Sequence, residues 1–483
     1  MDSTPPPPPP TTTGPGEPPN SPVPAFVLWA ACIVSFLAVL IANQFGEDPP
    51  KSNARLIQPP DTMDPLAMQT KLGVKLGAIV PQPASYAQQI RETVKSSTSN
   101  ADRLRAAIAL GEFEGSAAGL KQLDDFGSRT LSEDEAPLAD DATVVKMLLA
   151  DPPDAPSPEQ LAALRERHGF FADLALARGK PAGDASRAGL ESGGLQIVLV
   201  ALFAIIGGFI AFVGAIVALV ILINKVTGDN FRRHLVVPKG GASTVYLESF
   251  ALFLGGFALL HLGLPWLLGA TGVVKPGVAV PAWLTTFRLG LQWSLLLTIF
   301  WPLLRGVTVA QWKEATGWHR GRGTAKEIGC GLVGYGALLP CLFIVLLMLL
   351  FYVSYEKSHN PDAAPPSNPV ADLVMGASPF QLLLAFALMT IWAPVVEETF
   401  FRGILYRHLR GRMGIVASTA ISALWFGLMH GYSGILLLPV ITIGAGFALI
   451  REWRGSLIPT VLAHALHNFA IGALAIGFFT AFK

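Results

Sequence analysis

Residues 379–406 read PFQLLLAFALMTIWAPVVEETFFRGILY, an apolar stretch that contains two adjacent carboxylates and an arginine. A helix needs about 20 mainly apolar residues to cross the hydrocarbon core of a bilayer. Charged side chains inside such a helix are costly and mark functional sites by default. The stretch therefore predicts a membrane-spanning helix with a candidate site at Glu397, Glu398 and Arg402.

Eight more apolar runs accompany this one, so the sequence predicts an all-α polytopic membrane protein with about nine transmembrane helices. Charged residues make up 14% of the 483 residues, against about 25% in ordinary soluble domains. The net charge of +1 does not indicate a nucleic-acid partner, which a strongly basic chain would. The nine runs cover residues 25–43, 195–224, 247–268, 284–304, 329–353, 379–406, 413–431, 434–450 and 456–480.

The charged residues are concentrated between the first two runs. Of the 69 charged side chains, 38 lie within residues 44–193 and 29 lie in the much longer part from residue 194 onward. We therefore expect a disordered proline-rich tail at 1–24, a transmembrane anchor at 25–43, a soluble helical insert at 44–193 and an eight-helix membrane domain at 194–483.

Helix signals are clear inside the insert. Ser157, Pro158 and Gln160 are typical of a capping box with proline at the first helical position. A second helix is expected from about Ala101 to Phe113. The insert contains no catalytic signature, so a protein-binding or spacer role is its default interpretation.

Basic residues alternate between the connecting segments, which predicts the orientation in the membrane. Cytoplasmic loops carry an excess of Lys and Arg. On this rule the insert lies outside the cytoplasm, although Lys51 and Arg55, which follow the first anchor, weakly favour the opposite orientation. The basic segments, expected in the cytoplasm, are residues 225–244, 305–326, 407–412 and 451–454.

The polar residues of the last four runs follow a helical spacing. Glu398 and Arg402 are four residues apart and can pair on one helix face, which leaves Glu397 as the unpaired carboxylate and candidate general base. Phe426 with His430 and His464 with Asn468 have the same spacing. At 1.5 Å per residue, all these groups are expected in one band of depth, inward from the predicted cytoplasmic turns.

The three motifs Glu397-Glu398-x-x-x-Arg402, Phe426-x-x-x-His430 and His464-x-x-x-Asn468, in this order, resemble those of the CPBP family. This family includes the type II CAAX prenyl endopeptidases and is often described as intramembrane metalloproteases. The resemblance covers residues 379–477, about a fifth of the chain.

The resemblance implies an intramembrane endopeptidase that acts on a membrane-associated peptide or protein. Glu397, helped by His430, would activate water for attack on a peptide bond. His464 and Asn468 would stabilise the oxyanion, and Arg402 would hold Glu398.

The sequence leaves the cofactor open. Glu397, His430 and His464 are candidate ligands for a catalytic Zn²⁺ with one open position. The same residues also allow a metal-free general-base reaction, because one base and two hydrogen-bond donors suffice for water addition. We slightly favour the metal-free reaction. A His-Glu-x-x-His zinc motif is not present in the sequence.

Two non-protease functions stay open at this point. A non-catalytic membrane scaffold, or a bacteriocin-immunity-type protein, would keep the polar cluster for stability. A secondary transporter would use it as a proton relay, but the sequence has no evident internal repeat. The expected location is an integral, multi-pass position in a bacterial inner membrane.

Overall fold

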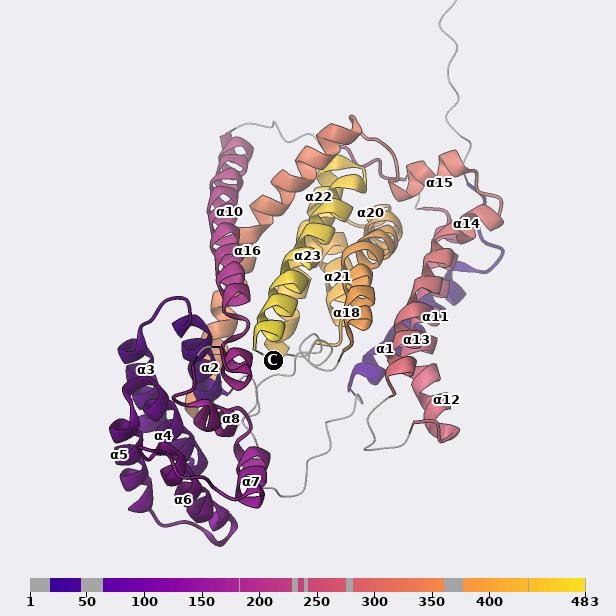
Figure 1. Ribbon diagram of the computed structural model, residues 1–483. Helices are drawn as coiled ribbons and strands as arrows, with labels where there is room; N and C mark the ends of the chain where they lie inside the picture. The colour runs from indigo at the N-terminus through magenta and orange to yellow at the C-terminus, as the bar shows by residue number, and fades with distance from the viewer. Residues whose placement is uncertain are drawn as a thin grey trace, which may run out of the picture. The chain divides into compact units, whose positions relative to one another are not determined.

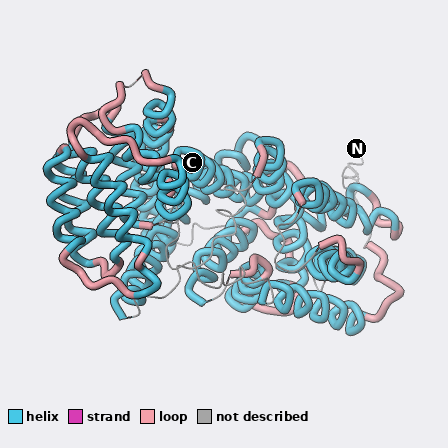
Figure 2. The backbone as a smooth tube through the Cα atoms, turned by 60° about the horizontal axis from the view of Figure 1, so that its bottom comes forward, coloured by secondary structure: helices cyan, strands magenta, loops and turns pink. Residues whose placement is uncertain are grey.

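The computed structural model describes residues 18–44, 64–181, 183–227, 233–238, 242–274, 281–359, 377–432 and 434–482. These residues form helices joined by turns, and no strand occurs among them (Figures 1 and 2). The predicted all-α polytopic fold is therefore confirmed. The chain divides into two compact units, here called the membrane unit (residues 1–50, 206–369 and 376–473) and the insert unit (residues 51–205, 370–375 and 474–483).

All nine predicted apolar runs form helices. Seven are long and apolar enough to span a membrane, and two are shorter, Ala25–Ile41 and Ile415–Leu428. The seven are Ala185–Ile221, Thr244–Ala270, Ala282–Leu304, Thr324–Glu356, Pro379–Arg410, Gly434–Arg454 and Ile458–Ala481.

Several of these segments are built from more than one helical piece. The helical pieces of the apolar segments, together with the short connecting helix α15 (Val309–Thr316), are α1 (Ala25–Gln44), α10 (Gly194–Thr227), α11 (Thr244–Ala258), η2 (Leu259–Gly263), α12 (Leu264–Ala270), α13 (Ala282–Gln292), η3 (Trp293–Phe300), α14 (Trp301–Leu304), α16 (Thr324–His359), α18 (Pro379–Ala387), η4 (Leu388–Trp392), α19 (Ala393–Glu397), η5 (Glu398–Leu405), α20 (Tyr406–Arg410), α21 (Ile415–Leu428), η6 (Gly434–Leu436), α22 (Leu437–Arg454) and α23 (Ile458–Ala481). Of these pieces, η2, η4 and η5 are π-helical.

The first anchor is part of the core of the membrane unit. Helix α1 packs along α11, and Cys32 and Val39 are fully buried. Phe36 stacks on Trp425 of α21 with ring centroids 4.6 Å apart. Before the helix, the backbone N–H of Ser21 donates to Thr244 Oγ1, so the end of the predicted disordered tail contacts α11. Residues 1–17 lie outside the described residues.

Close helix packing in the membrane unit uses glycine. A methyl group at Gly214 of α10 would overlap the carbonyl oxygen of Gly336 on α16. Small residues let two backbones approach in this way, which raises the dispersion attraction between transmembrane helices.

The insert unit has a hydrophobic core of its own. Ser157 and Gln160 form the predicted capping box, and the second predicted helix is α4. Its helices are α2 (Pro65–Gly77), α3 (Pro83–Ser96), α4 (Asn100–Glu114), α5 (Ser116–Gly127), η1 (Glu133–Glu135), α6 (Pro137–Leu149), α7 (Pro158–His168), α8 (Phe170–Ala177) and α9 (Ala185–Glu191).

A polar network is buried in the insert unit. His168 Nε2 lies 3.1 Å from Asp141 Oδ2, and Arg105 Nε donates to His168 Nδ1 over 3.3 Å. Arg167 Nε donates to the same Asp141 oxygen over 2.6 Å. Burial is the largest influence on His168 and lowers the pKa of its imidazole, so the ring is held neutral as a donor to Asp141.

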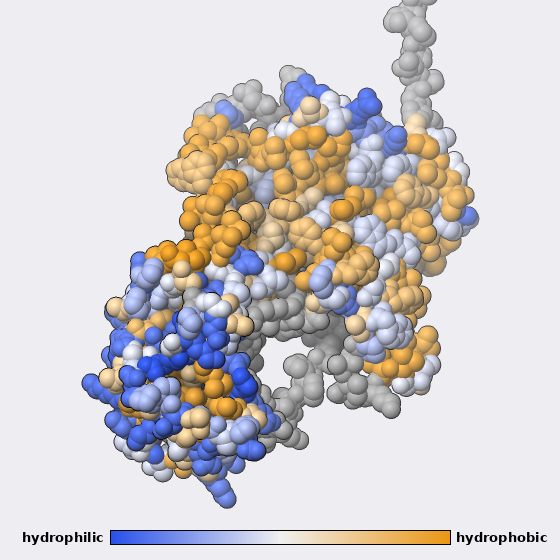
Figure 3. All heavy atoms as spheres, viewed as in Figure 1, coloured by the Kyte–Doolittle hydropathy of each residue, from blue (hydrophilic) through white to orange (hydrophobic). Residues whose placement is uncertain are grey.

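The surfaces of the two units differ in character. Helices α3 to α7 present a mostly hydrophilic face, whereas α10 is covered by hydrophobic side chains (Figure 3). Ile205, Phe209 and Phe212 of α10 are each more than 60% exposed. An exposed apolar helix of this length is suited to lipid and not to water.

Candidate active site

The helix that carries the glutamate pair changes its winding twice. Within Pro379–Arg410, the π-helical turns η4 and η5 interrupt the α-helix on either side of α19. Glu397 ends α19 and Glu398 begins η5. A π-turn widens the helix and changes the direction of the side chains beyond it, and such turns occur frequently at functional sites.

Glu398 and Arg402 form the ion pair that their spacing predicts. Arg402 Nη1 lies 2.9 Å from Glu398 Oε1, and both side chains are fully buried. Arg402 Nη2 donates to the carbonyl oxygen of Gly444 on α22 over 3.0 Å. The guanidinium also lies 4.2 Å from the ring centroid of Phe426. These contacts neutralise Glu398 in an apolar surrounding, where an isolated charge would be costly.

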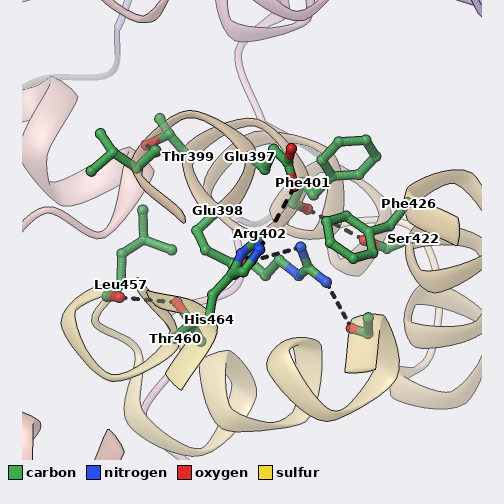
Figure 4. A network of polar contacts seen from close by, with 12 residues as sticks. Glu397, Glu398, Thr399, Phe401, Arg402, Ser422, Phe426, Leu457, Thr460 and His464 are labelled. Carbon is green, nitrogen blue, oxygen red and sulfur yellow. Dashed lines mark hydrogen bonds and ion pairs between the residues drawn. The ribbon is translucent and has the colours of Figure 1, made fainter. Parts of the chain in front are cut away.

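His464 reaches the same carboxylate from α23. Its Nδ1 lies 2.9 Å from Glu398 Oε1, and its ring stacks on Phe447 at 5.1 Å. Figure 4 shows His464 and Arg402 meeting at Glu398. An ionised carboxylate only accepts hydrogen bonds, so Nδ1 of His464 is the donor. The Nε2 atom then lies on the side of the ring that faces Glu397, 3.9 Å from Glu397 Oε2.

His430 approaches Glu397 from the other side. It follows the end of α21, and its Nδ1 lies 2.7 Å from the carbonyl oxygen of Phe426. A carbonyl oxygen can only accept, so Nδ1 donates and a neutral ring has its lone pair at Nε2. That Nε2 lies 4.0 Å from Glu397 Oε2.

Glu397 Oε2 is buried and makes no hydrogen bond to the described residues. It lies between the Nε2 atoms of His430 and His464, at 4.0 and 3.9 Å. These separations are too long for direct hydrogen bonds, but two hydrogen bonds of about 2.8 Å through one water reach up to about 5.6 Å. The arrangement suits a water held by a carboxylate and an imidazole.

Asn468 is placed differently from the other predicted residues. Its Nδ2 donates to the carbonyl oxygen of Met389 in η4 over 2.8 Å. It lies one helical turn beyond His464 on α23. The structure thus brings together Glu397, Glu398, Arg402, His430 and His464, whereas the described contact of Asn468 is to the backbone of the helix that carries the glutamates.

Several residues of the site have no counterpart in the three motifs. Gly444 and Phe447 of α22 contact Arg402 and His464. Thr399, next to the glutamate pair, accepts a hydrogen bond from Trp318 Nε1 over 2.9 Å. Gly444 and Phe447 share an i, i+3 face, which is the only sequence signal for them. Trp318 lies in the basic segment 305–326, where its aromatic ring resembles that of an interfacial anchor.

The candidate zinc ligands are not arranged as a metal site. Among the described residues, no group of three or more His, Cys, Asp or Glu side chains is placed to hold a metal ion. Tetrahedral Zn²⁺ with ligands at about 2.0–2.1 Å brings the ligand atoms to about 3.3–3.4 Å from one another. Glu397 Oε2 is 3.9 and 4.0 Å from the two Nε2 atoms, so the three side chains as placed are too far apart.

The comparisons with known proteins agree with this part of the chain. Neither a curated protein nor a solved structure matches the chain. One family model, described as "Type II CAAX prenyl endopeptidase Rce1-like", matches residues 379–470. The matched segment contains Glu397, Glu398, Arg402, His430, His464 and Asn468. Over residues 379–470 the chain is therefore similar to the type II CAAX prenyl endopeptidases, which supports the resemblance to CPBP-family intramembrane proteases.

Proposed function

We propose that the protein is an intramembrane endopeptidase that hydrolyses a peptide bond of a membrane-associated substrate. The observation that supports this best is the position of Glu397. Its Oε2 is buried without a hydrogen bond to the described residues and faces the Nε2 atoms of His430 and His464. Its neighbour Glu398 is neutralised by Arg402.

Glu397 is the general base in this proposal. A water donates one hydrogen bond to Glu397 Oε2 and the other to His430 Nε2. Its oxygen attacks the carbonyl carbon of the scissile peptide bond while one proton moves to Glu397. Glu397 then returns this proton to the nitrogen of the leaving amine as the C–N bond breaks.

In this proposal His464 donates a hydrogen bond to the oxyanion. Its Nδ1 is held by Glu398, so the donor is a hydrogen on Nε2. The Nε2–H then points toward the space beside Glu397 and donates to the oxyanion, a contact of the kind whose removal typically costs about 10²–10³ in rate. Asn468 acts on this site through the Met389 carbonyl of η4.

Glu397→Gln tests the proposal. Membranes from cells that produce the wild type and from cells that produce the variant are compared by proteomics of new peptide termini. We expect termini that appear with the wild type and disappear with Glu397→Gln. Glu356→Gln on α16 is the matched control, because it removes a carboxylate from the same unit far along the chain from the motifs. Identical termini for Glu397→Gln and wild type would refute the protease assignment.

The alternative, a non-catalytic scaffold or immunity-type protein, makes the opposite prediction for the same variant. In a scaffold, Glu397 would be kept for packing, and Glu397→Gln would lower the yield of folded protein. For the protease we expect a normal elution profile and an unchanged melting temperature. We also propose a bacterial inner membrane as the location, because the described spans are helices and outer-membrane proteins of bacteria are β-barrels.

A further inference from the structure

A second group of polar side chains lies in the membrane unit, away from the glutamate pair. A cavity of about 220 Å³ between η2–α12 and α13 is lined by His261, Thr285, Arg288 and Gln292. Arg288 belongs to the candidate span Ala282–Leu304. An arginine inside a membrane-spanning helix faces a cavity or a partner and marks a functional site by default.

These four side chains have unused hydrogen-bonding capacity. In the part of the chain that the structure describes, Arg288 forms no ion pair, and none of the four side chains takes part in a hydrogen bond. The His261 ring stacks on Phe257 at 4.1 Å, which leaves both of its nitrogen atoms at the ring edge. All four residues are partly buried. Because polar groups that lose contact with water normally find a hydrogen-bond partner, their convergence on one cavity points to a ligand.

Local structure directs the four side chains to the same place. Thr285, Arg288 and Gln292 are separated by three and four residues and therefore share one face of α13. His261 is the central residue of the π-helical turn η2. Among the described residues of the membrane unit, the other π-turns are η4, which precedes the glutamate pair, and η5, which begins at Glu398.

The cavity is distinct in depth from the candidate active site. The side-chain amide of Gln381 on α18 donates to the carbonyl oxygen of Ala282 over 2.8 Å, so α13 and α18 begin at one level. Both helices run upward in Figure 1, toward α14 and α20. Arg288 is six residues beyond Ala282, and Glu397 is sixteen residues beyond Gln381. At 1.5 Å per residue, they lie about 9 and 24 Å from the shared level.

We propose that this cavity binds the phosphate group of an anionic phospholipid. Arg288 supplies a full positive charge and a fork of donors that matches a phosphate, and Thr285, Gln292 and His261 add neutral hydrogen bonds. The rest of the lining is Leu260, Leu264 and Leu289, which suits the start of an acyl chain. The depth of about 9 Å is within reach of the headgroup region for a long arginine side chain.

Native mass spectrometry of the full-length protein in detergent tests the proposal. The protein is mixed with phosphatidylglycerol or phosphatidylcholine at equal concentrations. We expect Arg288→Gln to lose at least tenfold in phosphatidylglycerol binding and to keep its weak binding of phosphatidylcholine. Arg320→Gln is the matched control, since it removes the same charge from an exposed position of the same unit, and it should bind like the wild type.

Two results with these proteins would overturn the assignment, and a third applies if Arg288→Gln does not fold. One is equal phosphatidylglycerol binding by Arg288→Gln and Arg320→Gln. The other is a rise in melting temperature with inorganic phosphate as large as that with phosphatidylglycerol, because free phosphate would then be the ligand. Without lipid, Arg288→Gln should melt no lower than the wild type. If that variant does not fold, Thr285→Val with Gln292→Leu keeps the charge, and unchanged phosphatidylglycerol binding by this pair would also overturn the proposal.

Discussion

His464 Nδ1 lies 2.9 Å from Glu398 Oε1, the same oxygen that Arg402 Nη1 contacts at 2.9 Å. One carboxylate oxygen thus joins α23 to the helix of the glutamate pair and fixes which nitrogen of His464 faces Glu397. The two adjacent glutamates have different surroundings as a result. Glu398 contacts a cation and a ring donor through Oε1, whereas Glu397 Oε2 faces two imidazoles across gaps of 3.9 and 4.0 Å.

Arg402→Ala should lower the yield and melting temperature of the protein. The substitution strands Glu398 without its cation, and breaking a buried pair typically costs about 3–5 kcal/mol. Size-exclusion elution and thermal unfolding measure the effect. Arg410→Ala is the matched control, because Arg410 pairs with Glu452 at 3.0 Å nearer the helix end and should cost less. A larger loss for Arg410→Ala would contradict the structural role given to Arg402.

Asn468→Ala should reduce turnover strongly and leave substrate binding nearly intact. The Met389 carbonyl loses its donor, and an unpaired buried carbonyl costs about 1–3 kcal/mol. The π-turn η4 can then rewind and shift Glu397. Turnover and substrate affinity measured separately check this. Asn468→Asp cannot donate to Met389 and should be at least as slow, so wild-type turnover in either variant would show that the contact is dispensable.

Chelation should leave cleavage unchanged. Glu397 Oε2 lies farther from the Nε2 atoms of His430 and His464 than two ligand atoms of one Zn²⁺ lie from each other. The proposed activation of water therefore does not involve a metal. Protein dialysed against a strong chelator is compared with protein given stoichiometric Zn²⁺, using the termini found in the proteomic comparison. Loss of cleavage on chelation and its recovery with zinc would instead support the metal site that the sequence left open.

Acidification from neutral pH should lower the stability of the insert unit. Burial lowers the pKa of His168, so below pH of about 6.5 the unfolded chain binds a proton that the folded unit does not. The free energy of unfolding therefore falls as the pH is lowered through this region. At lower pH Asp141 acts in the same direction: burial opposes ionisation, but hydrogen bonds from Arg167 and His168 lower its pKa on balance.

Hydrogen exchange of the α7 and α8 amides, corrected for intrinsic rates, measures this pH dependence between pH 7.5 and 5. His168→Gln keeps one donor and one acceptor but does not titrate near neutral pH. We expect exchange to accelerate on acidification in the wild type and in the control His319→Gln, and much less in His168→Gln. The same acceleration in all three would assign the effect to other groups.

The orientation predicted from the basic segments can be measured by cysteine labelling. We expect a cysteine at Lys121, an exposed position of the insert unit, to react with an impermeant reagent added outside the cell. A cysteine at Met413, beside the basic turn 407–412, should react only after the cells are opened. Cys341 is exposed and is first replaced by alanine. Labelling of position 121 from the cytoplasmic side alone would reverse the predicted orientation.

Much of the fold follows from local patterns. Each apolar run became a helix close to its predicted limits, as for 456–480 and α23 at Ile458–Ala481. The capping box at Ser157 and the pair Glu398–Arg402 were also predictable. Both depend on helical spacing over three or four residues, which a sequence displays directly.

The finer placement in the site did not follow from these patterns. The spacing of His464 and Asn468 predicts a shared face toward the substrate, yet Asn468 donates to Met389. The π-turns η4 and η5 cannot be predicted from the sequence, because they form where side chains of other helices make hydrogen bonds to the backbone. Helical arithmetic at 3.6 residues per turn therefore misplaces side chains beyond each π-turn.

The sequence by itself determined that this protein is a helical membrane protein and which ionisable residues are candidates for its site, since hydropathy and helical period are local properties. Only the tertiary structure decided that Glu398 shares one oxygen with Arg402 and His464, that Gly444 holds the arginine, and that Glu397 stands apart from these contacts. Those relationships join helices 40 to 70 residues apart in the chain. They depend on how the helices cross and where their winding changes, and packing across the whole membrane unit sets both.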